Sequence, residues 1–239
     1  MDSLNEFLDF MPLLEGAKTE TFVAETQIIE PDVYATFEEH LKAHHKLTTE
    51  ALSMESFEYA LVKSLRRCGK RARLSPRGTP GCDAIIEGQN FSLKTQGDQN
   101  IKLSEIHISK YMELAKGRWG SDPKDLEGLR EQFIAHLDTY DRYLVLRSFR
   151  SEGWCRYELI EVPKRIFLLA KTGRVYMSAK SRTVPRSGYC PVFEGGPPPM
   201  YTLYFDGAAR KLSIKGLRKI LCHQHANWAV SVIEDDLRV

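Results

Sequence analysis

The fold of this chain is decided by two short stretches, Thr79-Pro80-Gly81-Cys82-Asp83 and Phe91-Ser92-Leu93-Lys94-Thr95. An apolar run and a turn rich in Gly and Asn separate them, which is a pattern typical of a β-hairpin. Because alternate side chains of a strand share one face, we expect Ser92 and Lys94 to meet Asp83 across the hairpin.

Such a hairpin gathers the chemical groups that phosphodiester hydrolysis needs. Mg²⁺ takes oxygen ligands from one or two carboxylates and completes its shell with water and phosphate. We therefore expect Asp83 and the backbone carbonyl of Leu93 to bind Mg²⁺, and Lys94 to hold or help deprotonate the attacking water. The alternative is an ordinary hairpin with a solvated lysine, because an Asp and a Lys on neighbouring strands often arise by chance.

The site needs a second carboxylate. Apolar spacing predicts a helix from Met54 to Cys68, with Glu58 one turn before Val62 inside its apolar stripe. A carboxylate that faces a core is costly unless it is paired or binds a metal, so we rank Glu58 first as the missing catalytic acid and metal ligand. A buried ion pair with a nearby arginine is the alternative. The other candidates are Glu113, ranked second, on a helix expected from Ser104 to Lys116, then Glu105 on that helix and Glu87.

Basic residues crowd the region between this helix and Asp83. The chain as a whole carries 34 basic and 32 acidic residues, a formal charge of +2, which argues against DNA binding by bulk charge. A local cluster can still hold phosphates, although a solvated helix end favoured by the helix dipole is the alternative. The residues we expect to bind DNA here are Arg66, Arg67, Lys70, Arg71, Arg73 and Arg77, and we add Lys110.

A long irregular stretch from Lys180 to Pro199 is a second candidate for DNA contact. It carries Arg182, Arg186 and a Gly-Gly-Pro-Pro-Pro run, and loops of this length in compact domains tend to be functional or disordered. Either arginine has the geometry to contact guanine O6 and N7 in a bidentate manner. A surface loop without function is the alternative.

The whole chain of 239 residues and 27.4 kDa fits one α/β nuclease domain, residues 1–239, with an N-terminal segment 1–30 and a catalytic core 54–116. We expect one central mixed sheet flanked by helices. Besides those already named, the expected helices are Pro31 to Leu47, Asp125 to Tyr140 and Pro163 to Ala170. The later strands are Arg142 to Ser148, Arg156 to Val162, Val175 to Ser178, Tyr201 to Asp206, Lys211 to Lys215 and Asn227 to Ile233.

Five scattered cysteines predict no disulfide framework. Cys222-His223-Gln224-His225 lacks the second ligand pair of a structural zinc site, so we expect Cys222 and His225 to face a core or the DNA. The sequence has neither a membrane-length apolar run nor the basic start of a secretory signal, and we expect a cytoplasmic protein.

Several further segments resemble a family of type II restriction endonucleases in the PD-(D/E)xK nuclease superfamily. The resemblance covers most of the chain from about residue 50, and one departure from the superfamily pattern is Ser92, which stands where an acid is usual. It implies a homodimeric, Mg²⁺-dependent enzyme that cuts double-stranded DNA at a short GC-rich palindrome, with CCCGGG to be tested first, alongside a cognate DNA methyltransferase that makes no stable contact. The matching segments are residues 57–58, 80–83, 93–95, 106–117, 159–164, 203–207 and 210–215.

Two alternatives of other classes remain open. Ser92 is compatible with a DNA-binding protein that has lost catalysis on the same fold, although the presence of both Asp83 and Lys94 counts against it. A repair nuclease that recognises DNA structure would be favoured by a larger basic stripe.

Overall fold

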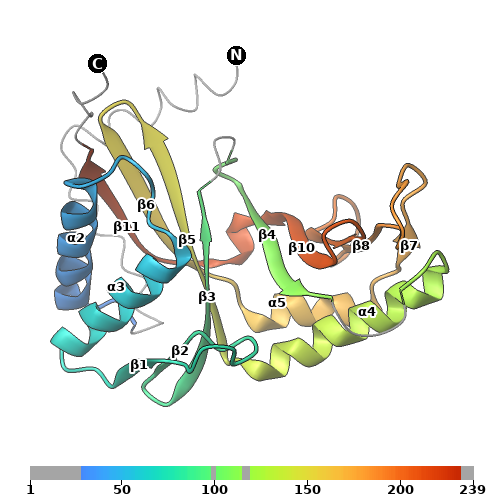
Figure 1. Ribbon diagram of the computed structural model, residues 1–239, viewed down its shortest axis with the longest axis horizontal. Coiled ribbons are helices and arrows are strands. Elements are labelled where there is room, and N and C mark those ends of the chain that lie inside the picture. Colours follow the sequence, from blue (N-terminus) through green and yellow to red (C-terminus); the bar gives the residue numbers. More distant parts are fainter. Residues whose placement is uncertain (1–27, 98–100, 115–118, 233–239) are drawn as a thin grey trace.

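The computed structural model describes residues 28–97, 101–114 and 119–232. Most of the expected N-terminal segment, and the ends of the expected elements that reach Lys116 and Ile233, lie outside these residues. Eleven strands in the described residues form two sheets, one with six strands and one with five. The two sheets occupy opposite halves of the molecule (Figure 1).

The six-stranded sheet has the order β1-β2-β3-β5-β6-β11. Its strands β3 and β5 run parallel, and the other neighbours run antiparallel, so the expected mixed sheet is present. A two-residue turn with positive φ at Glu87 and Gly88 joins β2 to β3, as hairpin geometry favours. The strands are β1 (Ala72–Leu74), β2 (Ala84–Ile86), β3 (Gln89–Gln96), β5 (Arg142–Ser151), β6 (Trp154–Glu161) and β11 (His223–Ser231).

Helices α2 (Pro31–His45) and α3 (Met54–Arg67) cover one face of this sheet, as Figure 1 shows at its left side. Both confirm the sequence prediction. The side chain of Ser53 caps α3 by accepting a hydrogen bond from the backbone N–H of Ser56. The buried face of α3, including Phe57 and Leu61, packs into a core with the strands.

The second sheet is antiparallel and was not expected as a separate unit. Its order is β4-β10-β9-β8-β7, so the late strands predicted at Val175 to Ser178, Tyr201 to Asp206 and Lys211 to Lys215 belong to this sheet and not to the central one. The last predicted strand, Asn227 to Ile233, falls in β11 and does complete the six-stranded sheet. Part of the predicted loop Lys180 to Pro199 is also a strand, because β8 pairs with β9. The strands are β4 (Glu105–Glu113), β7 (Tyr176–Met177), β8 (Gly188–Val192), β9 (Tyr201–Asp206) and β10 (Lys211–Arg218).

The predicted helix from Ser104 to Lys116 is wrong, because residues Glu105–Glu113 form β4. Ile106 and Ile108 alternate along the strand and are both buried. They lie opposite Leu217 and Ile214 of β10. Helical and strand spacing coincide over a stretch this short, and pairing with a distant strand outweighs local propensity.

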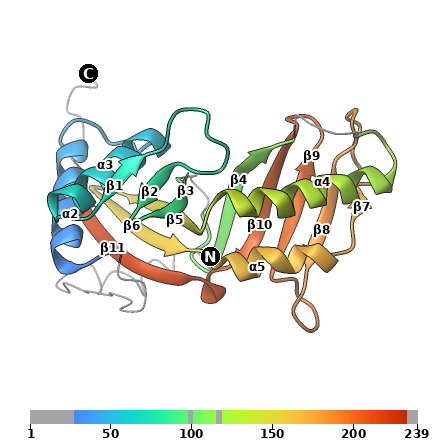
Figure 2. The same ribbon diagram turned by 90° about the horizontal axis from the view of Figure 1, so that it is seen from below.

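Helices α4 (Pro123–His136) and α5 (Lys164–Leu168) lie against the second sheet (Figure 2), and each is followed by a short 3₁₀ helix. Strand β5 contributes to two cores. Tyr143 and Val145 point to the core that contains α4 and α5, whereas Leu144 and Leu146 point to the core that contains α2 and α3. The apolar segment of β5 is therefore buried on both faces of the sheet. None of the helices in the described ranges is long and apolar enough to span a membrane.

Candidate active site

The β2–β3 hairpin places the predicted residues together. Asp83 Oδ2 accepts hydrogen bonds from the backbone N–H of Leu93 at 2.7 Å, from Lys94 Nζ at 3.0 Å and from Ser92 Oγ at 3.3 Å. Lys94 Nζ also donates to the Leu93 carbonyl at 2.9 Å. The expectation that Ser92 and Lys94 meet Asp83 is thus confirmed. The ammonium lies between the two oxygen groups that were expected to bind a cation.

Glu58 lies on α3 close enough to interact electrostatically with this group. The pKa of Glu58 is raised to about 7, first by burial and then by the negative charge of Asp83, while the positive charge of Lys94 opposes both effects. Two carboxylates near one ammonium leave an excess of negative charge, which a divalent cation would neutralise. With the Leu93 carbonyl they supply three oxygen groups, which is the donor chemistry that Mg²⁺ takes before water and phosphate complete its shell. The residues therefore fit a Mg²⁺ ion.

Within the described residues, no three side chains of His, Cys, Asp or Glu lie together so that they could hold a metal ion. The hairpin site is compatible with this, because its third donor is the backbone carbonyl of Leu93. The same finding means that Cys222 and His225 do not belong to such a group. His225 is buried and bonds Glu161 Oε2 at 2.9 Å, while Arg142 Nε donates to Glu161 Oε1 at 2.9 Å.

The other acids considered for the second ligand have different surroundings. Glu113 is exposed near the end of β4 and forms an ion pair with Lys110 at 2.7 Å, which lowers the pKa of Glu113. Glu105 pairs with Lys102 at 3.4 Å. Glu87 lies in the hairpin turn and pairs with the exposed Arg71 at 3.1 Å. Among these candidate acids, Glu58 is the one whose pKa responds to the charges of Asp83 and Lys94, so it is the acid next to these two residues.

The end of α4 and the short 3₁₀ helix that follows it (Leu137–Thr139) bring two residues, His136 and Thr139, to the hairpin, and the sequence did not single out either of them. Gly81 has a φ of +69°, and a Cβ added there would overlap Thr139 Oγ1 and lie 2.9 Å from Cε1 of His136. The turn before Asp83 therefore needs glycine both for its backbone conformation and for this close approach. The available signal was a histidine in the last turns of the helix predicted from Asp125 to Tyr140, but it lies more than fifty residues from the hairpin in the sequence, so the contact could not be inferred.

Most of the expected DNA-binding residues are exposed, and several form surface ion pairs. Arg67 pairs with Glu39 and Arg77 with Glu55, at 3.2 and 3.3 Å, while Lys70 pairs with Glu30. Arg66 and Arg73 are exposed without an ionic partner among residues 28–97, 101–114 and 119–232. Exposed pairs of this kind are weak, so these side chains remain available for phosphates.

The two arginines of the long stretch differ. Arg182 is exposed. Arg186 is partly buried, and its guanidinium donates to the Ser178 carbonyl at 3.1 Å, while its own carbonyl accepts from Trp119 Nε1 at 2.9 Å. Arg186 therefore stabilises the loop, whereas Arg182 is available to a ligand.

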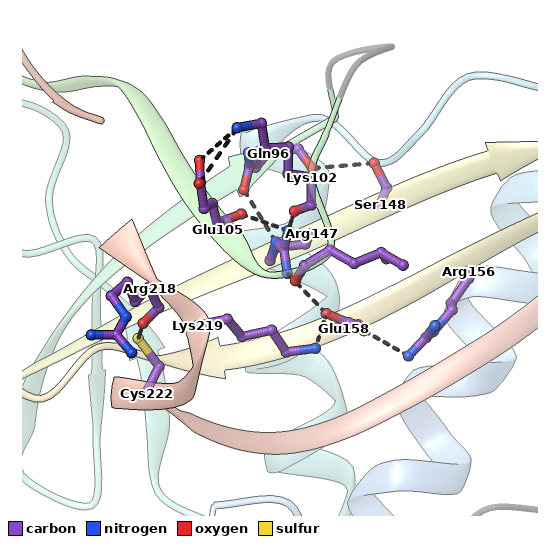
Figure 3. Close-up of polar contacts among 11 residues, drawn as sticks. Gln96, Lys102, Glu105, Arg147, Ser148, Arg156, Glu158, Arg218, Lys219 and Cys222 are labelled. Atoms are coloured by element: carbon purple, nitrogen blue, oxygen red, sulfur yellow. Dashed lines mark hydrogen bonds and ion pairs between the residues drawn. The ribbon is translucent and has the colours of Figure 1, made fainter. Parts of the chain in front are cut away.

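A buried polar network lies beyond the hairpin, at the far end of β3 and β5 (Figure 3). Arg147, which is fully buried, donates to Gln96, to Glu158 and to the backbone carbonyls of residues 102, 103 and 105. Glu158, also fully buried, accepts in addition from Arg156 at 2.6 Å and from Lys219 at 2.8 Å. The network thus fixes the start of β4 against the six-stranded sheet.

Three comparisons relate the chain to known proteins. The profile of the SmaI family, described as type II site-specific deoxyribonuclease, matches residues 16–230. The type II restriction enzyme SmaI of Serratia marcescens is 37% identical over 227 residues, which cover 94% of this chain and 90% of that enzyme. A solved restriction endonuclease in complex with substrate DNA aligns with 84% of this chain and 80% of its own at 13% identity, with a TM-score of 0.36, and is too distant to inform the site.

Proposed function

Because the chain belongs to the SmaI family of type II site-specific deoxyribonucleases, we propose that it uses the hairpin of Asp83 and Lys94, with Glu58 of α3, to hydrolyse phosphodiester bonds of double-stranded DNA with Mg²⁺. The observation that carries this proposal is the convergence of Asp83, Lys94 and the Leu93 carbonyl within hydrogen-bonding distance, with Glu58 affected by the same charges.

Each residue has a defined part in the reaction. Asp83, Glu58 and the Leu93 carbonyl would hold the cation, which supplies a positive charge for the negative charge that develops on the phosphate. Lys94 holds the attacking water and, as an ammonium, helps to deprotonate it by stabilising the hydroxide that forms, so that the proton passes to solvent as the new O–P bond forms. The bond to the 3′-oxygen then breaks and this oxygen takes up a proton from solvent water, so the products carry 5′-phosphate and 3′-hydroxyl ends. Ser92 supports Asp83 by its hydrogen bond.

The recognition site and the assembly are also parts of the proposal. We take CCCGGG as the first palindrome to test, because the SmaI family shares the segments on which the resemblance rests. A palindrome read by one short chain calls for a two-fold dimer. As a cytoplasmic restriction enzyme, the protein would require a cognate methyltransferase that protects the host DNA without a stable contact.

The proposal is tested by substitution at the hairpin. Asp83→Ala and Lys94→Ala should each reduce cleavage of plasmid DNA by orders of magnitude with the fold retained, because each removes a group that acts on the reacting phosphate. Specific binding should survive in Lys94→Ala. The fragments from wild-type digestion with Mg²⁺ give the site and the cut position when their ends are mapped.

Lys46→Ala, which removes an exposed cation at the end of α2 that has no part in the proposed DNA contacts, is a control for general loss of charge. Near wild-type cleavage by either hairpin variant would contradict the assignment. An inactive wild-type protein that still binds DNA specifically would identify the chain as a catalytically impaired DNA-binding protein.

A further inference from the structure

His136, the last residue of α4, faces the turn that leads into Asp83. Its Cε1 and Nε2 atoms lie 2.9 and 3.0 Å from the point where a Gly81 side chain would begin. The absence of a side chain at Gly81 therefore leaves the imidazole edge directly beside the Pro80–Asp83 turn. Thr139, which occupies the rest of this space, donates its hydroxyl to the His136 carbonyl at 2.7 Å, so its proton is already used.

The imidazole lies within the electrostatic range of the proposed catalytic residues. Burial lowers the pKa of His136, the charge of Lys94 lowers it further, and the charge of Asp83 raises it. The ring is therefore mainly neutral near pH 7 and carries one N–H that it can donate. A neutral donor suits a position beside an ammonium, because a second full positive charge there would be repelled.

Two tyrosines fix the orientation of the ring. The rings of Tyr111 and Tyr140 contact His136 in edge geometry, with centroids at 5.6 and 6.3 Å. The hydroxyl groups of the two tyrosines are hydrogen-bonded to each other, and both residues are buried. An imidazole held in this way loses little freedom when a ligand binds, which is the condition for precise positioning of a substrate group.

We propose that His136 is a further residue of the nuclease site and donates a hydrogen bond from Nε2 to a non-bridging oxygen of a DNA phosphate at the Pro80–Asp83 turn. This inference rests on the proposed function of the hairpin. It gives the crossover helix a direct part in substrate positioning, so that the phosphate is held from one side by the hairpin and from the other by α4.

The test compares two variants that separate donation from packing. His136→Phe keeps an aromatic ring and removes the donor, whereas His136→Gln keeps an N–H donor and removes the ring. If His136 binds phosphate, the single-turnover rate should fall by about 10-fold or more in His136→Phe, as expected for loss of a hydrogen bond to a charged group, and should partly recover in His136→Gln. If the ring only packs against Gly81, the order of the two variants is reversed, which overturns the proposal.

A second measurement locates the phosphate. Duplexes carrying the mapped recognition site and one methylphosphonate at a time, near the cut, are bound to wild type and to His136→Phe in Ca²⁺. One replacement should weaken wild-type binding by about 10-fold more than it weakens binding by His136→Phe, because the variant has already lost the hydrogen bond to that phosphate and loses only the hairpin's contacts. Equal weakening of both proteins at every phosphate would overturn the proposal.

Asp83→Ala distinguishes this inference from the function on which it rests. If Asp83→Ala is inactive while His136→Phe cleaves like wild type, the inference about His136 fails and the proposed function stands. If Asp83→Ala cleaves like wild type, the proposed function of the hairpin is wrong, and the inference about His136, which rests on it, is wrong as well.

Discussion

Glu58 combines partial burial with a neighbouring negative charge, and both raise its pKa, to about 7. An unfolded chain would have an ordinary glutamate pKa near 4.5. The folded metal-free protein therefore binds this proton more tightly than the unfolded chain does. The contribution of this proton to the stability of the folded protein is fully present below pH 4.5 and is lost as the pH rises through about 7. This cost is the expected property of a carboxylate kept to bind a cation.

Glu58→Gln should consequently stabilise the metal-free protein at pH 8 and have little effect at pH 5. We expect a gain on the order of 1–2 kcal/mol in the free energy of unfolding at pH 8, since one pKa unit corresponds to about 1.4 kcal/mol and solvent screening reduces the full value. Urea unfolding at the two pH values measures it.

Ser92→Ala is the matched control at the same site, because it removes a hydroxyl without changing the charge. The Mg²⁺ concentration needed for half-maximal cleavage should rise far more in Glu58→Gln than in Ser92→Ala. If this Mg²⁺ concentration changes little and equally in both variants, Glu58 is not the second metal ligand, and Glu113 or Glu87 becomes the candidate.

The elements around the site are joined by the buried ions Arg147 and Glu158, on β5 and β6, whose side chains are 0% and 1% exposed. Glu158 is the common acceptor of three cations, Arg147, Arg156 and Lys219. Through the backbone carbonyls that Arg147 binds, the network fixes the segment that leads from β3 into β4. It therefore holds the six-stranded sheet and the second sheet together.

Glu158→Gln should destabilise the protein by about 3–5 kcal/mol, because removal of one buried partner leaves the others uncompensated. Glu113→Gln breaks an exposed ion pair with Lys110 and should leave the free energy of unfolding nearly unchanged. Urea unfolding of both variants provides the comparison. Equal costs would mean that the network contributes no more than a surface pair.

At the scale of the whole molecule, the proposed palindromic site requires two copies of the chain on one DNA duplex. The protein should be a dimer when bound to DNA, and sedimentation with a duplex carrying the mapped site tests this. Within that complex Arg182 is available for bases, whereas Arg186 is held by Ser178.

Arg182→Ala should therefore relax the preference at a single base pair by about 1–3 kcal/mol, as expected for a lost bidentate contact. Arg186→Ala should instead lower the melting temperature. Cleavage rates on the cognate duplex and on duplexes with one base pair changed distinguish the two. If both variants keep full discrimination, the basic residues Arg73 and Arg77 become the next candidates for reading bases.

The sequence by itself determined the elements whose signals are local. The hairpin with Asp83 and Lys94 follows from turn residues and alternation within seventeen positions, and α2, α3 and α4 follow from apolar stripes of helical period. Glu58 could be selected because a carboxylate within an apolar stripe requires a partner. These inferences depend only on residues that are close together in the sequence, so one amino-acid sequence is enough to make them.

The tertiary structure decided what depends on contacts between distant segments. β4 is a strand because β10, about a hundred residues later, pairs with it, and β7, β8 and β9 join the same separate sheet through pairing of the same kind. His136 reaches Gly81 because parallel β3 and β5 require a crossover, whose helix α4 ends beside the hairpin. Arg147 and Glu158 are tolerated in the interior because distant groups satisfy them. The free energy of such contacts comes from pairing and burial across the chain, which local periodicity does not encode.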